Sequence, residues 1–109
     1  MSNSIFAEEI DEFIMLDLEK AERPETSSKY QEIVVIGYVK DYVRGDNIEL
    51  LIITPDGTEE KISTYATKKG EVYTLLHFTK ESQIGIYKIT LIYNEIERAS
   101  TNFEMIEKP

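Results

Sequence analysis

The sequence predicts an all-β fold, an antiparallel β-sandwich of seven strands. From Glu32 onward, six short apolar segments follow one another, and residues typical of turns separate each segment from the next. No segment with helical periodicity lies between them, which favours antiparallel sheets over a parallel α/β sheet. A chain of 109 residues has the usual size of one domain. We therefore expect these six strands and one N-terminal strand to enclose a single core.

The first three of the six segments differ in how apolar they are. Residues 32–39, EIVVIGYV, are apolar on both faces of the expected strand, and residues 47–54, NIELLIIT, repeat that pattern. The second of these stops at Pro55-Asp56-Gly57, where proline restricts φ and glycine can take a positive φ, so we expect a turn. Residues 59–67, EEKISTYAT, are more polar, as is typical of a strand at the edge of a sheet.

The last three segments complete the expected sheets. A turn at residues 68–70, KKG, leads into residues 70–79, GEVYTLLHFT, which are again apolar on both faces. Residues 86–93, IYKITLIY, show the cleanest alternation in the chain. Residues 98–106, RASTNFEMI, follow as the second arm of a hairpin.

The N-terminal residues 8–23, EEIDEFIMLDLEKAER, allow two interpretations. A helix would gather on one side Ile10, Phe13, Ile14 and Leu18. A strand would direct toward the core Ile14, Leu16 and Leu18, and outward Phe13 and Met15. We expect the strand, because a sandwich needs it as its first strand, and keep a short helix as the alternative. The domain should then span residues 13–106, between an N-terminal tail at 1–12 and a C-terminal tail at 107–109.

Five stretches carry a resemblance to a known family: IVVIGYV, DYVRGDNIELLIITPDG, GEVYTLLHF, GIYKITLIY and ASTNFEMI. In this order they resemble one repeat of the immunoglobulin-like β-sandwiches of archaeal surface and adhesin-type proteins, to which bacterial and macroglobulin-type domains are related. The elements that carry the resemblance are Gly37, Gly45, Pro55-Asp56-Gly57, and Gly85 two residues before Tyr87. The resemblance implies a non-enzymatic structural module of an extracellular or cell-envelope assembly.

Two of these residues also have a physical interpretation of their own. Tyr87, early in the penultimate strand, suits a tyrosine corner, in which the hydroxyl hydrogen-bonds back to the main chain. Gly37, inside a strand, suits a place where another group approaches the backbone closely.

Composition excludes several partners and environments. The 21 Asp and Glu residues against 12 Lys and Arg residues give a formal charge of −9, which repels a phosphate backbone and an anionic membrane surface. No apolar run approaches the roughly 20 residues that a membrane-spanning helix needs. The chain has no cysteine, which excludes disulfides and thiolate metal sites. We expect neither nucleic-acid binding nor membrane insertion.

The sequence offers no catalytic constellation. His77 is the only histidine, so no histidine pair can hold zinc and no second imidazole can relay a proton. No Gly-x-Ser-x-Gly turn is present to expose a serine nucleophile. We expect His77 to lie on the surface without catalytic duty, and we expect no enzyme.

Acidic residues in loops raise the possibility of calcium. Two groups could supply loop oxygens: Asp41, Asp46 and Glu49, and Asp56, Glu59 and Glu60. Their spacing does not match a calcium loop of alternating acidic residues, so we expect no cofactor and keep a calcium-stabilised adhesin domain as an alternative. The tripeptide Arg44-Gly45-Asp46 is used by integrin-binding sandwiches, but the resemblance makes it an ordinary loop of the repeat.

The second apolar face is the main functional signal of the sequence. If the first, second and fifth predicted strands share a sheet, seven apolar side chains become neighbours on its outside: Phe13, Met15, Val34, Ile36, Tyr38, Tyr73 and Leu75. Soluble monomers seldom expose so large an apolar patch. A protein partner, a neighbouring domain, a second copy, or the N-terminal segment folded as a helix would cover it. Two alternatives are a register error of one residue and a carbohydrate-binding module whose stacking platforms are Tyr38, Tyr73 and Tyr93.

Overall fold

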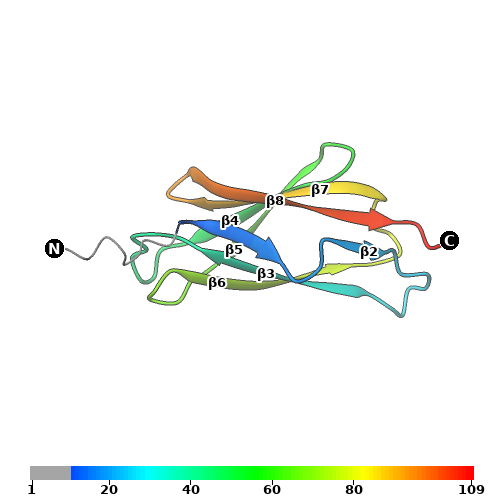
Figure 1. Cartoon of the computed structure of the whole chain (residues 1–109), viewed down its shortest axis with the longest axis horizontal. Helices are drawn as coiled ribbons and strands as arrows, with labels where there is room; N and C mark the ends of the chain where they lie inside the picture. Colours follow the sequence, from blue (N-terminus) through cyan, green and yellow to red (C-terminus); the bar gives the residue numbers. More distant parts are fainter. Residues whose placement is uncertain (1–10) are drawn as a thin grey trace.

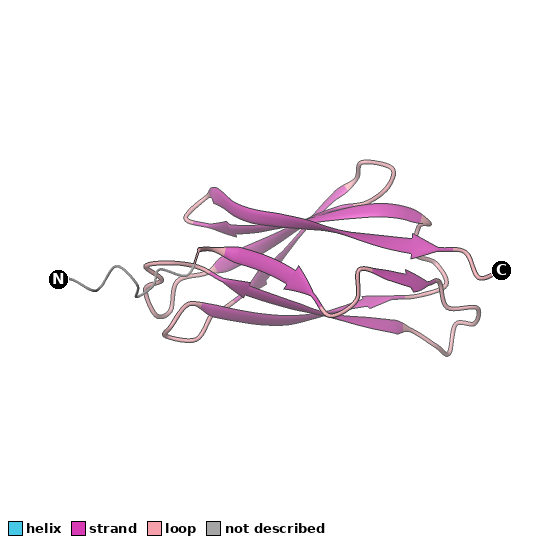
Figure 2. Cartoon of the chain, in the orientation of Figure 1, coloured by secondary structure: helices cyan, strands magenta, loops and turns pink. Residues whose placement is uncertain are grey.

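The computed structural model describes residues 11–109, and all the regular secondary structure within them is β-strand (Figures 1 and 2). The eight strands are β1 (Phe13–Leu16), β2 (Lys20–Glu22), β3 (Gln31–Tyr38), β4 (Ile48–Ile53), β5 (Glu59–Thr64), β6 (Glu71–Phe78), β7 (Gly85–Tyr93) and β8 (Ile96–Ile106). The all-β prediction is thereby confirmed for this part of the chain. Of the predicted N-terminal tail, residues 1–10 lie outside the described residues.

Two sheets pack face to face (Figure 2). The smaller sheet has the strand order β1-β3-β6, and the larger has the order β2-β8-β7-β4-β5. Neighbouring strands are antiparallel except for β2, which runs parallel to β8. The polar strand β5 lies at a sheet edge, as its composition predicts.

The prediction of seven purely antiparallel strands is wrong at the N-terminal segment. This segment forms two strands instead of one, because the chain leaves the smaller sheet after Leu16 and joins the larger sheet at β2. Main-chain hydrogen bonds from Glu104 to Glu19 (2.9 Å) and from Arg23 to Ile106 (2.8 Å) hold β2 against β8. Leu18, expected in the core, lies at this crossover and is 42% exposed. The alternative of a helix is wrong for the described residues of the segment.

The core lies between the sheets, and in nearly every strand the side chains that fill it are those predicted to point inward. Side chains of both sheets are fully buried there: Ile33, Val35, Ile48, Leu50, Ile89, Leu91, Phe103 and Met105. Three rings form a cluster at one end, with Phe78 4.9 Å from Phe103 and 5.0 Å from Tyr87 between centroids. Such close aromatic packing adds to the area buried by each ring.

The turn after β4 has the predicted form. Thr54 N donates to Thr58 O (2.9 Å), and Gly57, with φ of 90°, donates to Thr54 O (2.8 Å). The Asp56 carboxylate accepts hydrogen bonds from the Thr54 hydroxyl (2.7 Å) and from Thr58 N (3.0 Å). These donors hold the pKa of Asp56 well below its usual range, because they stabilise the charged form.

The tyrosine corner predicted from the sequence is confirmed. The Tyr87 hydroxyl donates to the carbonyl oxygen of Gln83, four residues upstream, at 2.7 Å. The ring is buried against Phe78 and Phe103, and this burial raises the pKa of the phenol. The bond closes the turn that enters β7.

Candidate partner-binding face

The outer face of the β1-β3-β6 sheet brings the seven predicted residues together. Cross-strand pairs place Phe13 beside Tyr38 and Val34 beside Leu75, and they place Ile36 between Met15 and Tyr73. Four of the seven side chains are exposed, namely Met15, Ile36, Tyr73 and Leu75, and the other three are half-buried. We call these seven residues the apolar face. Their common placement agrees with the prediction, and their binding role stays a prediction.

Alternation along each strand explains why this face is apolar while the core is also filled. Side chains two residues apart point to the same side of a sheet, so Ile14 and Leu16 enter the core while Phe13 and Met15 point out. Both parities of β3 and most of β6 are apolar. An antiparallel sheet that faces solvent on one side normally carries polar residues on that side, so an apolar outer face is unusual.

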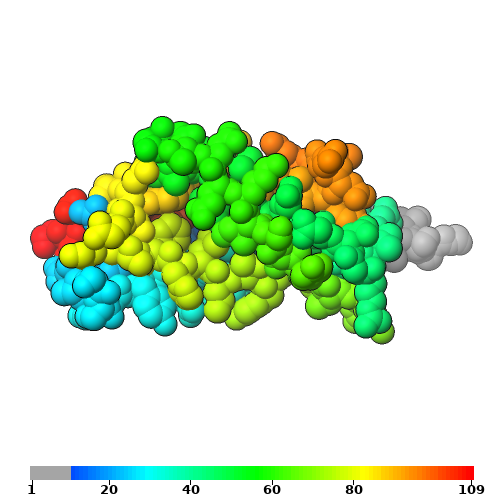
Figure 3. Space-filling view, turned by 180° about the vertical axis from the view of Figure 1, so that it is seen from behind, coloured from blue at the N-terminus to red at the C-terminus, as the bar shows by residue number. Residues whose placement is uncertain are grey.

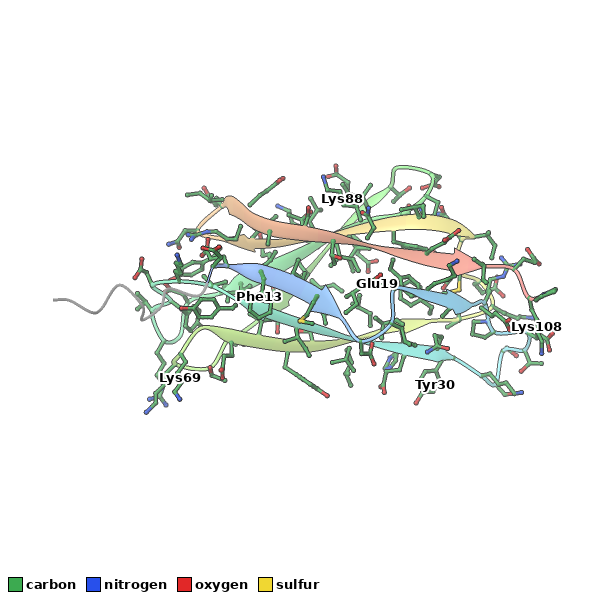
Figure 4. All side chains as sticks on the ribbon, in the orientation of Figure 1. Phe13, Glu19, Tyr30, Lys69, Lys88 and Lys108 are labelled. Atoms are coloured by element: carbon green, nitrogen blue, oxygen red, sulfur yellow. The ribbon has the colours of Figure 1, made fainter. Side chains whose placement is uncertain are left out.

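A hollow of about 620 Å³ lies at the β1 start of this face. Its apolar lining comes from Phe13, Ile36, Tyr38, Val72 and Tyr73, and its polar lining from Thr67, Lys69 and Glu71. Phe13 and Lys69 are seen at the same end of the molecule, and Lys69 reaches away from the body (Figure 4).

Gly37 contributes main chain to the floor of the hollow. A Cβ there would lie 3.1 Å from Leu91 Cδ2 and 3.3 Å from Phe13 O. This agrees with the close approach that the sequence predicts at Gly37, and it lets β1 lie tightly beside β3.

The opposite end of the face is polar. His77 Nε2 lies 3.1 Å from Glu32 Oε2, and the Tyr30 ring meets the His77 ring edge-on at 4.7 Å between centroids. His77 is exposed, as predicted from its parity. Sequence reasoning missed Tyr30, which projects from the chain just before β3 (Figure 4). The sequence did contain the information, since Tyr30 lies four residues before Val34 and therefore has the same strand parity as the apolar face.

Hydrogen bonds at both ends fix β1 in place. The Glu12 carboxylate accepts from Arg98 Nη1 (2.8 Å) and from Lys40 N (2.9 Å), and the Glu12 and Arg98 side chains are each only 18% exposed. At the other end, Asp17 Oδ1 accepts from Val34 N (2.9 Å). The residues of β1 are therefore held in place on the apolar face.

The structure corrects one candidate, because Tyr93 cannot serve as a stacking platform. It is buried in the larger sheet, where its hydroxyl donates to Asp46 Oδ2 (2.6 Å) and accepts from Val43 N (3.0 Å). The hydrogen bond to Asp46 raises the pKa of the Tyr93 phenol. The main-chain carbonyl oxygen of Asp46 also accepts a hydrogen bond from the Tyr42 hydroxyl (2.6 Å). The acidic residue of the Arg44-Gly45-Asp46 tripeptide therefore has a structural role.

The acidic loop residues do not form a metal site in the part of the chain that the structure describes. Among residues 11–109, no three His, Asp or Glu side chains are grouped so that they could hold a metal ion. Neither the Asp41, Asp46 and Glu49 group nor the Asp56, Glu59 and Glu60 group converges. No helix within this range is long and apolar enough to cross a membrane.

Comparison with known proteins supports the architecture. No protein-family model matches the chain, and no curated protein does. An immunoglobulin-like protein from Pseudomonas aeruginosa superposes with a TM-score of 0.50 and 16% identity, over 80% of this chain and 77% of that one. The alkylpurine DNA glycosylase AlkC of Pseudomonas fluorescens, bound to DNA with an abasic site analogue, gives a TM-score of 0.53 and 9% identity. That match covers 87% of this chain but only 29% of the glycosylase. At these identities the likeness concerns the fold alone, and the chain is an immunoglobulin-like β-sandwich.

Proposed function

We propose that this protein is a non-enzymatic interaction module that binds a protein partner through the apolar face. The observation that carries the proposal is the contiguity of seven apolar side chains, four of them exposed, on one outer sheet surface. Contiguous apolar surface of this kind marks sites of protein association.

The composition of the face suits a binding interface. Tyrosine, phenylalanine and methionine are enriched at interface cores, and Phe13, Met15 and Tyr73 lie here. The hollow beside Tyr73 can receive one apolar side chain of the partner as an anchor, while Lys69 and Glu71 supply a polar rim.

The partner is a different protein, and charge is the reason. A second copy of the chain would bring a formal charge of −9 toward another charge of −9, which opposes self-association. A neutral or basic partner meets no such barrier. We place the assembly outside the cell or in its envelope on the sequence resemblance alone.

Photo-crosslinking tests this proposal. A benzophenone amino acid at position 73 should give a specific adduct in the source cells, and the partner should then be purified. Met15→Glu should weaken that complex about thirtyfold, the cost of losing a residue worth about 2 kcal/mol. Ile86→Glu is a matched control, since Ile86 is 51% exposed like Met15 but lies in the other sheet, and it should change the affinity less than twofold.

Three outcomes would contradict the proposal. The first is no specific adduct at position 73, and the second is equal weakening by Met15→Glu and Ile86→Glu. The third is an adduct between two copies of this chain, with light scattering that shows a dimer dispersed by Met15→Glu. That third result would replace a partner protein with self-association.

One observation favours a second candidate function, carbohydrate binding. Tyr38 and Tyr73 line the same hollow, where their rings could stack on a sugar while Thr67, Lys69 and Glu71 offer polar contacts. Saturable glycan binding by the monomer, lost in Tyr73→Ala, would support this function instead.

A further inference from the structure

The open side of the sandwich, between β5 and β6, is a second surface apart from the apolar face. β6 is the last strand of the smaller sheet and β5 is the last strand of the larger one. The Thr64 and Thr74 hydroxyls lie 3.0 Å apart and join the two strands at one point. Beyond it the strands border a hollow that is visible from behind, between green β5 and yellow-green β6 (Figure 3).

The outer edge of β6 has main-chain groups available for pairing. On the side away from β3, Thr67 N donates to Glu71 O (2.9 Å). Because main-chain groups alternate in direction along an antiparallel strand, Leu75 and His77 point their N–H and C=O groups to this same side. Among the described strands, only β3 pairs with β6, and the isolated bridge from Ala66 reaches no further than Val72. An exposed edge of this kind is a template for another strand.

A groove of about 310 Å³ runs beside this edge. Its apolar lining comes from Ile52, Ile62, Leu75, Leu76, Phe78 and Tyr87. The turn at residues 79–83 closes one end, where Ser82 N donates to Thr79 O (3.0 Å). The Thr64–Thr74 contact closes the other, so the groove has room for a short segment only.

The negative charge around the groove favours a basic occupant. Glu60 and Glu81 line it, and none of the lining residues within 11–109 is lysine or arginine. A second copy would bring its own acidic edge to this place, and the formal charge of −9 on each chain would oppose the contact. An extended segment with basic residues matches the acidic lining.

We propose that this groove binds a short basic segment of a partner protein as an added strand on β6. The segment pairs with the N–H and C=O groups of Leu75 and His77, which requires about four or five extended residues. Alternate side chains of the segment point inward, where a central apolar side chain packs on Leu76 and Phe78. The flanking lysines or arginines meet Glu60 and Glu81. This site shares only Leu75 with the apolar face: the Leu75 side chain lies on that face, while its main chain borders the groove. Each site can therefore be tested without the other.

The test uses the capped peptide TKTLTKT, which places leucine and both lysines on its inward side. Titration into the full-length protein should give saturable amide shifts at Leu75 and His77 and slow their hydrogen exchange. The acidic peptide TETLTET should bind at least tenfold more weakly. A version N-methylated on the two threonines beside leucine should lose binding, because those N–H groups pair with the strand edge.

Two sets of variants locate the contact. His77→Pro removes the edge N–H together with the imidazole and its contacts to Glu32 and Tyr30, and it should abolish peptide binding. Proline is tolerated at a strand edge, so the fold should persist. His77→Thr is its matched control, because it also removes the imidazole but keeps the N–H, and it should bind within threefold of the parent. If His77→Pro does not fold, Glu60→Gln combined with Glu81→Gln should weaken binding at least tenfold.

The outcomes separate this site from the apolar face. Met15→Glu should leave peptide binding unchanged, whatever it does to a partner of the apolar face. Absence of saturable shifts at millimolar peptide would overturn the proposal. So would shifts centred on Met15 and Tyr73, or equal binding of the basic and acidic peptides.

Discussion

Replacing Tyr87 with phenylalanine isolates the tyrosine corner from the rest of the core. The ring stays packed against Phe78 and Phe103, while the hydrogen bond of 2.7 Å to Gln83 O is lost. The bond contributes about 1 kcal/mol, and the carbonyl left without this partner adds up to about 1 kcal/mol more. We expect Tyr87→Phe to lower the free energy of unfolding by about 1–2 kcal/mol. For a domain of this size, each kcal/mol corresponds to a Tm decrease of about 4–8 °C.

Urea unfolding followed by circular dichroism measures this loss. Tyr73→Phe is the control, because Tyr73 is 67% exposed on the outer face, and its free energy should change by less than about 0.5 kcal/mol. The reasoning is refuted if Tyr87→Phe also falls within that limit, or if both variants lose the same amount.

The pH dependence of the Tyr87 contribution has a definite sign. Burial raises the pKa of Tyr87 in the folded protein above its unfolded value of about 10. The folded state therefore holds this proton more tightly, and the stabilisation is complete below pH 10 and is lost as the pH rises through the folded pKa. The difference between wild type and Tyr87→Phe should shrink above pH 10. A difference that stays constant to high pH would contradict this account.

Two further predictions concern turns. Asp56→Ala should lower the free energy of unfolding at pH 7, and this loss should be smaller at pH 3. The lowered pKa of Asp56 stabilises the folded state above the unfolded pKa of about 4, and this stabilisation decreases as the pH falls toward the folded pKa. Equal losses in urea unfolding at both pH values would contradict this. Gly70→Ala should cost at least about 2 kcal/mol in the same assay, since its φ of 87° disfavours a side chain and a Cβ would overlap Val39 O. Gly45→Ala, with a φ of 95° but nothing within 4 Å of a Cβ, should cost only about 1 kcal/mol, and equal losses would show that the overlap has no effect.

The apolar face could be predicted because strand parity is a local property. Once residues 32–39 and 70–79 are read as strands, the period of two decides which side chains share a side, so Ile36 and Tyr73 separate from Val35 and Val72 without any tertiary information. The predicted grouping of the first, second and fifth strands in one sheet is confirmed.

The N-terminal crossover could not be predicted in the same way. The strand β2 has the sequence KAE, which carries no apolar alternation, and it exists because it pairs with β8 more than 80 residues away. Leu18 therefore lies outside the core, although simple alternation along the strand predicts it inside. Tyr93 is a different case, because it has the inward parity of Ile89 and Leu91, so strand alternation by itself places its ring in the core.

Local patterns were enough to predict the all-β class, the principal turns, the tyrosine corner and the two apolar sides of β3 and β6, because periodicity and glycine or proline chemistry act over a few neighbouring residues. The polar composition of residues 59–67 also predicted β5 at a sheet edge, but the place of β6 at the other edge and the distance between the two edges depend on how the sheets pack. The groove beside β6 depends on that distance, because Ile62 and Glu60 come from one sheet and Leu76 and Phe78 from the other. Contacts between residues far apart in sequence are set by the packing of whole sheets, and no local pattern carries them.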